Sequence, residues 1–208
     1  MELQFHGANC LTINTKQARV TIDDNLTELG AKTVTKAGDV VIYTKEYDLP
    51  TQEARLLING PGEYEVADVS VQGMTVRAHT DEEGSKTATL FKIVINEIRI
   101  VVTGHIYPEL NENELEIIGT TDILCVPVGG NGYTLDGIGA LKIIKKIEPK
   151  LIIPTHYADS ALKYPVPQQS LGDALKGLAM EPRETIEKLK IKSSDLLDVT
   201  QLIVLERS

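Results

Sequence analysis

Four histidines are the residues of this sequence best suited to metal or acid–base chemistry: His6, His79, His105 and His156. His156 follows closely on a short apolar run, residues 151–153, which is typical of a buried strand. Without further context, a histidine at the end of a strand is more often a hydrogen-bonded structural residue than a metal ligand. The place of each histidine in the fold therefore decides what chemistry it does.

Residues 122–157, which lead up to His156, predict a strand–helix–strand unit. Apolar runs at 123–126 and 151–153 predict the strands, and the helix between them stops before Pro149. The apolar stripe of the helix consists of Leu135, Ile138, Leu141 and Ile144. Such a unit packs as two parallel strands with the helix on one face. Because chemistry in open α/β sheets collects at the carboxyl ends of the strands, His156 lies at a chemically favoured edge.

The rest of the chain divides into a strand-rich first half and a second half in which strands and helices alternate. Helices are expected from Asn111 to Gly119 and at 170–178, with a short helical turn at 193–197. The expected strands outside the central unit are residues 2–5, 9–14, 17–22, 39–44, 54–58, 64–71, 74–78, 87–95, 97–102, 187–191 and 201–205. The first three predict an antiparallel meander. No linker separates the halves, so residues 1–208 are expected to form one domain of two packed sheets with outer helices.

Composition narrows the class of protein. The 208 residues include no Trp and only two Phe, so Val, Ile and Leu must build the core, which favours β-rich architecture. The net charge of −9 argues against a nucleic-acid or anionic-membrane binder. Cys10 and Cys125 lie in apolar stretches and are expected to be buried, reduced thiols. No signal peptide or membrane-spanning run is visible, so a cytoplasmic protein is expected.

Six stretches of the sequence resemble, in order, segments of the small metallo-β-lactamase-fold hydrolases. They are FHGANCLTI, NGPGEYEV, RAHTDEEGS, RIVVTGHIYPELNENEL, DILCVPVGG and PKLIIPTHY. The resemblance covers the whole chain and implies an α/β fold (α+β by sheet content), the four-layer αββα sandwich. In this family, the ends of such segments supply the ligands of a metal centre.

The sequence departs from the family where the main metal motif, His-x-His-x-Asp-His, is expected. The predicted strand 39–44 is followed by KEYDLP, so Lys45 and Tyr47 stand at the positions of the first two histidines. Leu49 and Pro50 replace the Asp and the last His of the motif. The resemblance therefore implies the fold but not the usual dinuclear zinc centre.

Other ligand positions are partly kept. His79 and His156 match retained ligand positions, and His105 stands where the family has a metal-bridging carboxylate; Ala8 replaces an early histidine. The fold implied by the resemblance places His79, His105 and His156 at strand ends that face one cleft. Three neutral imidazoles are a known ligand set for catalytic zinc, which lowers the pKa of a bound water to about 7. The cofactor is therefore expected to be one Zn, or none.

Lys45 argues against a metal, because its ammonium group is positively charged and cannot act as a ligand. Three alternatives remain open for it. It pairs with Glu46 or Asp48, it replaces the charge of the metal and holds an anionic ligand, or it points to water. Asp136 likewise has two interpretations: a carboxylate at a helix N-terminus, or a partner that orients His156.

Two hypotheses for the function follow. The first is a non-catalytic relative that keeps the scaffold for binding or assembly, with an unknown small-molecule ligand or a second copy of the chain as partner. The second is an atypical metal-dependent hydrolase with one metal ion on His79, His105 and His156. Neither hypothesis includes nucleic acid or a membrane as a partner.

Overall fold

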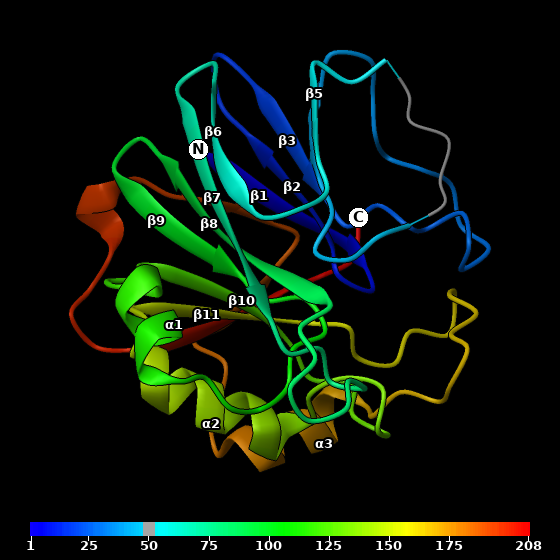
Figure 1. Ribbon diagram of the computed structural model, residues 1–208. Coiled ribbons are helices and arrows are strands. Elements are labelled where there is room, and N and C mark those ends of the chain that lie inside the picture. Colours follow the sequence, from blue (N-terminus) through cyan, green and yellow to red (C-terminus); the bar gives the residue numbers. More distant parts are fainter. Residues whose placement is uncertain (48–52) are drawn as a thin grey trace.

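Two β-sheets pack face to face in the computed structural model, which describes residues 1–47 and 53–208 (Figure 1). The motif positions Asp48, Leu49 and Pro50 lie outside the described residues. The six-stranded sheet has, in spatial order, β13 (Lys188–Lys190), β1 (Glu2–Gly7), β2 (Cys10–Asn14), β3 (Arg19–Ile22), β4 (Val40–Ile42) and β5 (Leu56–Ile58). The predicted meander is confirmed, since β1, β2 and β3 pair antiparallel. β4 and β5 then add in parallel.

The eight-stranded sheet contains the predicted strand–helix–strand unit. Its order is β12 (Glu184–Ile186), β14 (Gln201–Leu205), β11 (Leu151–Thr155), β10 (Ile123–Pro127), β9 (Ile98–Val102), β8 (Ala88–Ile95), β7 (Val69–Val76) and β6 (Gly62–Val66). β9, β10 and β11 are parallel neighbours, so their carboxyl ends meet at one edge of the sheet. The apolar core between the sheets includes both phenylalanines, Phe5 and Phe91, and is otherwise largely aliphatic.

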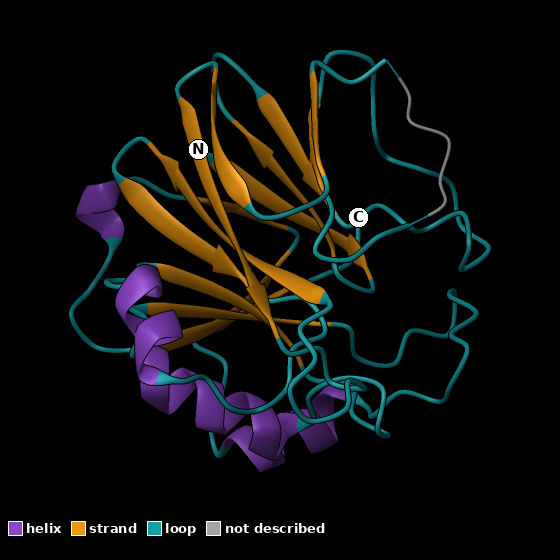
Figure 2. Ribbon diagram, in the orientation of Figure 1, coloured by secondary structure: helices purple, strands orange, loops and turns teal. Residues whose placement is uncertain are grey.

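Three α-helices cover the outer face of the eight-stranded sheet: α1 (Glu112–Ile118), α2 (Gly137–Ile147) and α3 (Leu171–Leu178) (Figure 2). The apolar stripe predicted for α2 is wrong at one position, because Ile138 is 61% exposed. The buried face consists instead of Ala140, Ile143, Ile144 and Ile147. At the start of α2, Gly137 packs so closely against α3 that a Cβ there would lie 2.3 Å from the Ala174 carbonyl oxygen. The close approach of Gly137 to α3 therefore accompanies the outward position of Ile138.

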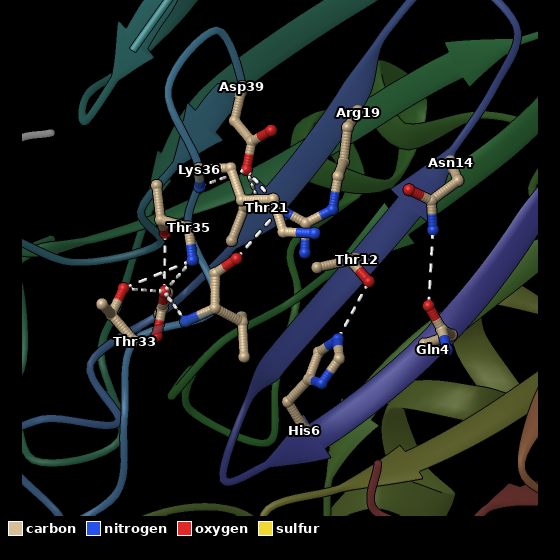
Figure 3. A network of polar contacts seen from close by, with 12 residues as sticks. Gln4, His6, Thr12, Asn14, Arg19, Thr21, Thr33, Thr35, Lys36 and Asp39 are labelled. Atoms are coloured by element: carbon tan, nitrogen blue, oxygen red, sulfur yellow. Dashed lines mark hydrogen bonds and ion pairs between the residues drawn. The ribbon is translucent and has the colours of Figure 1, made fainter. Parts of the chain in front are cut away.

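The outer face of the six-stranded sheet carries a polar network instead of a helix in the described part of the chain (Figure 3). Asp39 accepts hydrogen bonds from Thr21 and Arg19, and His6 contacts Thr12 at 2.9 Å. Burial, followed by the charge of Arg19, lowers the pKa of His6 to about 4. His6 is therefore a neutral structural residue at neutral pH, as expected for an isolated histidine.

Two predicted strand boundaries are wrong. The turn between β6 and β7 lies at Ala67 and Asp68, both with positive φ, rather than at Gln72 and Gly73. The strand predicted at 187–191 is short and follows a second one: β12 joins the eight-stranded sheet and β13 the six-stranded sheet. The chain thus crosses between sheets at this point, which an apolar pattern alone does not reveal. The two cysteines are buried and free, as predicted.

Candidate functional site

Side chains from the ends of three strands meet in one cluster. His105 follows β9, His156 follows β11, and their ring centroids are 4.6 Å apart. Tyr133, in the turn between β10 and α2, lies 4.8 Å from His105 and 5.8 Å from His156. The ring of Tyr164 lies 5.1 Å from that of His156, tilted by 51°. Together with Lys45, which follows β4, these residues are here termed the central cluster.

His156 is held tightly by its surroundings. Its side chain is buried, and its φ of 53° lies in the left-handed region, which costs an L-residue about 1–2 kcal/mol. Its backbone N–H donates to the Ala8 carbonyl at 2.7 Å, and its ring Nδ1 contacts Oε1 of Gln168 at 3.0 Å. Burial lowers the pKa of His156 to about 4, with a smaller lowering by Lys45. The imidazole is therefore neutral at neutral pH.

His105 is also neutral, because burial, and after it the neighbouring His156 ring and the charge of Lys45, hold its pKa well below the usual value. Its Nε2 lies 3.2 Å from Nδ2 of Asn9, whose Oδ1 accepts a hydrogen bond from the Thr155 hydroxyl at 2.8 Å. Its Nδ1 is buried and has no partner among the described residues. One polar atom of this ring is thus available to a ligand.

His79 is connected to the central cluster by a backbone hydrogen bond. Its N–H donates to the carbonyl of His105 at 2.7 Å, while its ring lies 6.4 Å from that of Tyr107. Burial lowers the pKa of His79, and its Nδ1 also lacks a partner among the described residues. The structure therefore brings His105 and His156 ring to ring and connects His79 to them by a main-chain hydrogen bond.

The described residues do not present the set of ligands that the family's usual two-metal centre requires. In residues 1–47 and 53–208, no group of three or more His, Cys, Asp or Glu side chains is placed to hold a metal ion. The ammonium of Lys45 stands at the end of β4, where the family's metal motif begins.

Lys45 is half-buried among aromatic rings. Its Nζ donates to the Tyr133 hydroxyl at 3.3 Å and lies 4.9 Å from the ring centroid of Tyr47 and 5.7 Å from that of Tyr133. No carboxylate of the described residues, Glu46 included, forms an ion pair with it within 4.0 Å. Within residues 1–47 and 53–208, the positive charge of Lys45 is therefore not neutralised by an ion pair.

Tyr47 is one of the aromatic residues beside Lys45. Its ring packs edge-on against Tyr43 at 5.2 Å, and burial raises the pKa of its hydroxyl well above the usual value. Tyr47 is consequently a neutral hydrogen-bonding and packing group beside Lys45.

Asp136 is the N-cap of α2, where its Oδ1 accepts a hydrogen bond from the N–H of Gly139 at 2.7 Å. The alternative role, orienting His156, is taken by Gln168, which contacts the ring Nδ1. Asp136 remains close enough to His79 to raise the pKa of that imidazole slightly against the effect of burial.

Several residues of the site cannot be recognised by sequence reasoning. Asn9, Tyr133, Tyr164 and Gln168 carry no motif, and Asp23 is visible only as a polar break after a strand. The useful signal is position: Asn9 and Asp23 adjoin the carboxyl ends of β1 and β3, and Tyr133 follows the glycine turn after β10. Gln168 lies in a long connection and has no comparable signal.

Comparisons with known proteins agree with this fold. The model of the β-lactamase superfamily domain matches residues 2–156, so the chain belongs to the metallo-β-lactamase superfamily. A proposed Zn-dependent hydrolase of this superfamily from Thermotoga maritima is 22% identical, with a TM-score of 0.75, and 99% of each chain is covered. The predicted sandwich fold is confirmed.

Two further solved structures share the fold at lower identity. A metallo-hydrolase from the archaeon Ignicoccus hospitalis is 14% identical, with a TM-score of 0.64, and 100% of this chain and 95% of that chain are covered. The metallo-β-lactamase-fold protein YhfI from Bacillus subtilis is 8% identical, with a TM-score of 0.59, and 100% and 97% are covered. At such identities the likeness concerns the fold alone. Among the described residues, no helix is long and apolar enough to cross a membrane.

Proposed function

We propose that this protein is a non-hydrolytic member of the metallo-β-lactamase superfamily that binds a small oxyanion at Lys45 without a metal ion. The observation that carries the proposal is the half-buried ammonium of Lys45, which has no carboxylate partner in the described part of the chain. Lysine binds phosphate-like groups as a compact point charge.

The neighbours of Lys45 suit an anion better than a cation. Because Tyr133 accepts a hydrogen bond from Lys45, its own hydroxyl hydrogen is free to donate to a ligand oxygen. His105 and His156 are neutral, so Lys45 supplies the positive charge that attracts an anion to the central cluster. A metal ion at ~4 Å from Lys45 would instead be repelled by about 4 kcal/mol per unit of its charge at an effective dielectric constant of roughly 20.

The test is calorimetric titration of metal-free protein with inorganic phosphate. Lys45→Met removes the ammonium and keeps most of the apolar stem, and we expect it to weaken binding by about tenfold or more. Lys146→Met, on the exposed face of α2, is the matched control and should bind like the wild type. Equal affinity of the wild type and K45M, or turnover of ester, lactone or phosphodiester probes by the metal-free protein, would refute the proposal.

A mononuclear zinc site on His79, His105 and His156 is the second candidate. It is favoured by the Nδ1 atoms of His79 and His105, which are buried without partners in the described residues. It requires the side chains to move, since their present positions form no three-ligand group. Elemental analysis of protein purified without chelator or affinity histidines decides it: one zinc per chain that is lost in H105A and H156A supports this candidate over the first.

A further inference from the structure

The hydrogen on the His156 ring can be assigned from the bonds of Gln168. The side-chain Nε2 of Gln168 lies 2.8 Å from the backbone carbonyl oxygen of Val166. A carbonyl oxygen only accepts hydrogen bonds, so the amide nitrogen must face it, and the orientation of the Gln168 amide is fixed. Oε1 then faces Nδ1 of His156 at 3.0 Å. Because Oε1 only accepts, Nδ1 carries the hydrogen.

The other ring nitrogen of His156 is therefore an acceptor. A neutral imidazole carries one hydrogen, and a hydrogen on Nδ1 leaves a lone pair on Nε2. No described residue forms a hydrogen bond with this Nε2. Burial and Lys45 both oppose a second proton on the ring. His105 allows no such assignment, because Asn9 faces the Thr155 hydroxyl, which both donates and accepts.

The arrangement depends on a glycine. A Cβ at Gly129 would lie 2.1 Å from Oε1 of Gln168 and 2.1 Å from the carbonyl oxygen of His156. Any side chain at residue 129 would thus push Gln168 away from the ring. Gly129 follows β10, and Val128 beside it donates its N–H to the Thr155 carbonyl at 2.9 Å, which holds the turn against β11. The fold therefore fixes both partners of the Gln168–His156 bond.

The ring of His156 lies close to the residues that are proposed to bind the anion. Lys45 donates to the hydroxyl of Tyr133, and the ring of Tyr133 is 5.8 Å from that of His156. Lys45 is also near enough to the ring of His156 to lower its pKa. A ligand oxygen bonded to Lys45 and Tyr133 therefore lies near the ring of His156, on which Nε2 is the nitrogen with a free lone pair. A lone pair attracts an O–H group and repels an oxygen that carries no hydrogen.

We propose, on the basis of the proposed function, that Gln168 is a positioning residue that fixes His156 as a hydrogen-bond acceptor, and that the site consequently selects oxyanions which retain a hydroxyl hydrogen. Inorganic phosphate and phosphate monoesters in their hydrogen form belong to this class at neutral or mildly acidic pH. Sulfate, which has a similar shape and no hydrogen, does not. The preference arises because sulfate has no hydrogen to donate to Nε2 of His156, and its binding would leave that lone pair buried without a partner.

The experiment compares inorganic phosphate with sulfate in calorimetric titrations at about pH 6.5, where phosphate still carries a hydrogen and sulfate does not. The wild type is expected to prefer phosphate by about tenfold or more. In Gln168→Met the ring is free to carry its hydrogen on Nε2, and the preference should fall to about threefold or less. Gln169→Met is the matched control, because Oε1 of this neighbouring glutamine has no hydrogen-bond partner among the described residues.

Nitrogen-15 NMR of the His156 ring supplies a readout that a merely structural role would not change. We expect the Nδ1–H tautomer in the wild type and in Q169M, and a mixture of tautomers in Q168M. An Nε2–H tautomer in the wild type would overturn the inference. So would equal affinities for phosphate and sulfate that K45M abolishes together, an outcome that leaves the proposed function standing. Failure of the wild type to bind either anion would overturn both.

Discussion

At the scale of the residue, Asp23 connects the candidate site to the six-stranded sheet. It follows β3 with a positive φ of 47°, it is buried, and its two oxygens accept hydrogen bonds from the N–H and the hydroxyl of Thr44 at 2.7 and 2.6 Å. Thr44 immediately precedes Lys45, so Asp23 fixes the backbone from which the ammonium projects. Burial raises the pKa of Asp23 to about 6, although the bonds from Thr44 and the charge of Lys45 oppose this.

A pH-dependent stability follows from Asp23. Its pKa in the folded protein, about 6, exceeds the value of about 4 in an unfolded chain, so the folded state holds a proton that the unfolded state has lost. This contribution is complete below about pH 4 and disappears as the pH rises through about 6. Between these limits the wild type should lose about 3 kcal/mol of unfolding free energy relative to Asp23→Asn.

Urea denaturation of the two proteins across this pH range measures the difference directly, because contributions of the other carboxyl groups cancel in the comparison. Parallel stability curves for the wild type and D23N would show that Asp23 has an ordinary pKa.

The residues of the site differ in how far the sequence predicts them. Lys45, His105 and His156 each follow a predictable strand, so their place at one edge could be inferred from the pattern. The partners of the histidines could not, because their contacts depend on the folded chain: Asn9 is 96 residues from His105. Gln168 reaches His156 only because residue 129 lacks a side chain.

At the scale of elements, Thr44 joins the two sheets. It follows β4 in the six-stranded sheet, and its carbonyl accepts a hydrogen bond from Thr89 of β8 in the other sheet at 2.8 Å. Gly104, after β9, packs directly on it: a Cβ at residue 104 would lie 2.2 Å from the hydroxyl oxygen of Thr44. Because Thr44 is bonded to Asp23, it has little freedom to move aside.

Gly104→Ala should therefore destabilise the protein by about 2–4 kcal/mol, from steric overlap together with the positive φ of 59°. Gly84→Ala is the control, since Gly84 also has a positive φ, 89°, but nothing lies within 4 Å of the position that a Cβ would take there. It should cost only about 1–2 kcal/mol. Thermal unfolding of both variants checks this, and equal losses would mean that Gly104 does not pack tightly against Thr44.

A helix or strand could be predicted where the pattern lies within its own segment of the sequence. The prediction failed where contacts with other elements determine the structure. The parallel pair β10 and β11 could be inferred from two apolar runs around a helix. The rotation of α2 accompanies the contact of Gly137 with α3, and the crossing between β12 and β13 depends on which sheet has a free edge. Neither is encoded in the periodicity of its own segment.

At the scale of the whole molecule, the fold does not determine the chemistry of the site. The superfamily sandwich brings the ends of β4, β9 and β11 together whether or not these ends carry metal ligands. In this chain the ends carry an ammonium and neutral imidazoles. The order of the family-like segments made the sandwich predictable from the sequence, whereas the ligand depends on side-chain hydrogen bonds that only the folded structure displays.

The measurement that tests the account most directly is the affinity of untagged protein for inorganic phosphate, determined once with excess EDTA and once with micromolar ZnCl₂. Because Lys45 supplies the positive charge, we predict the same affinity in both solutions. Binding that appears only when zinc is added would contradict the account and assign the charge of the site to a metal ion.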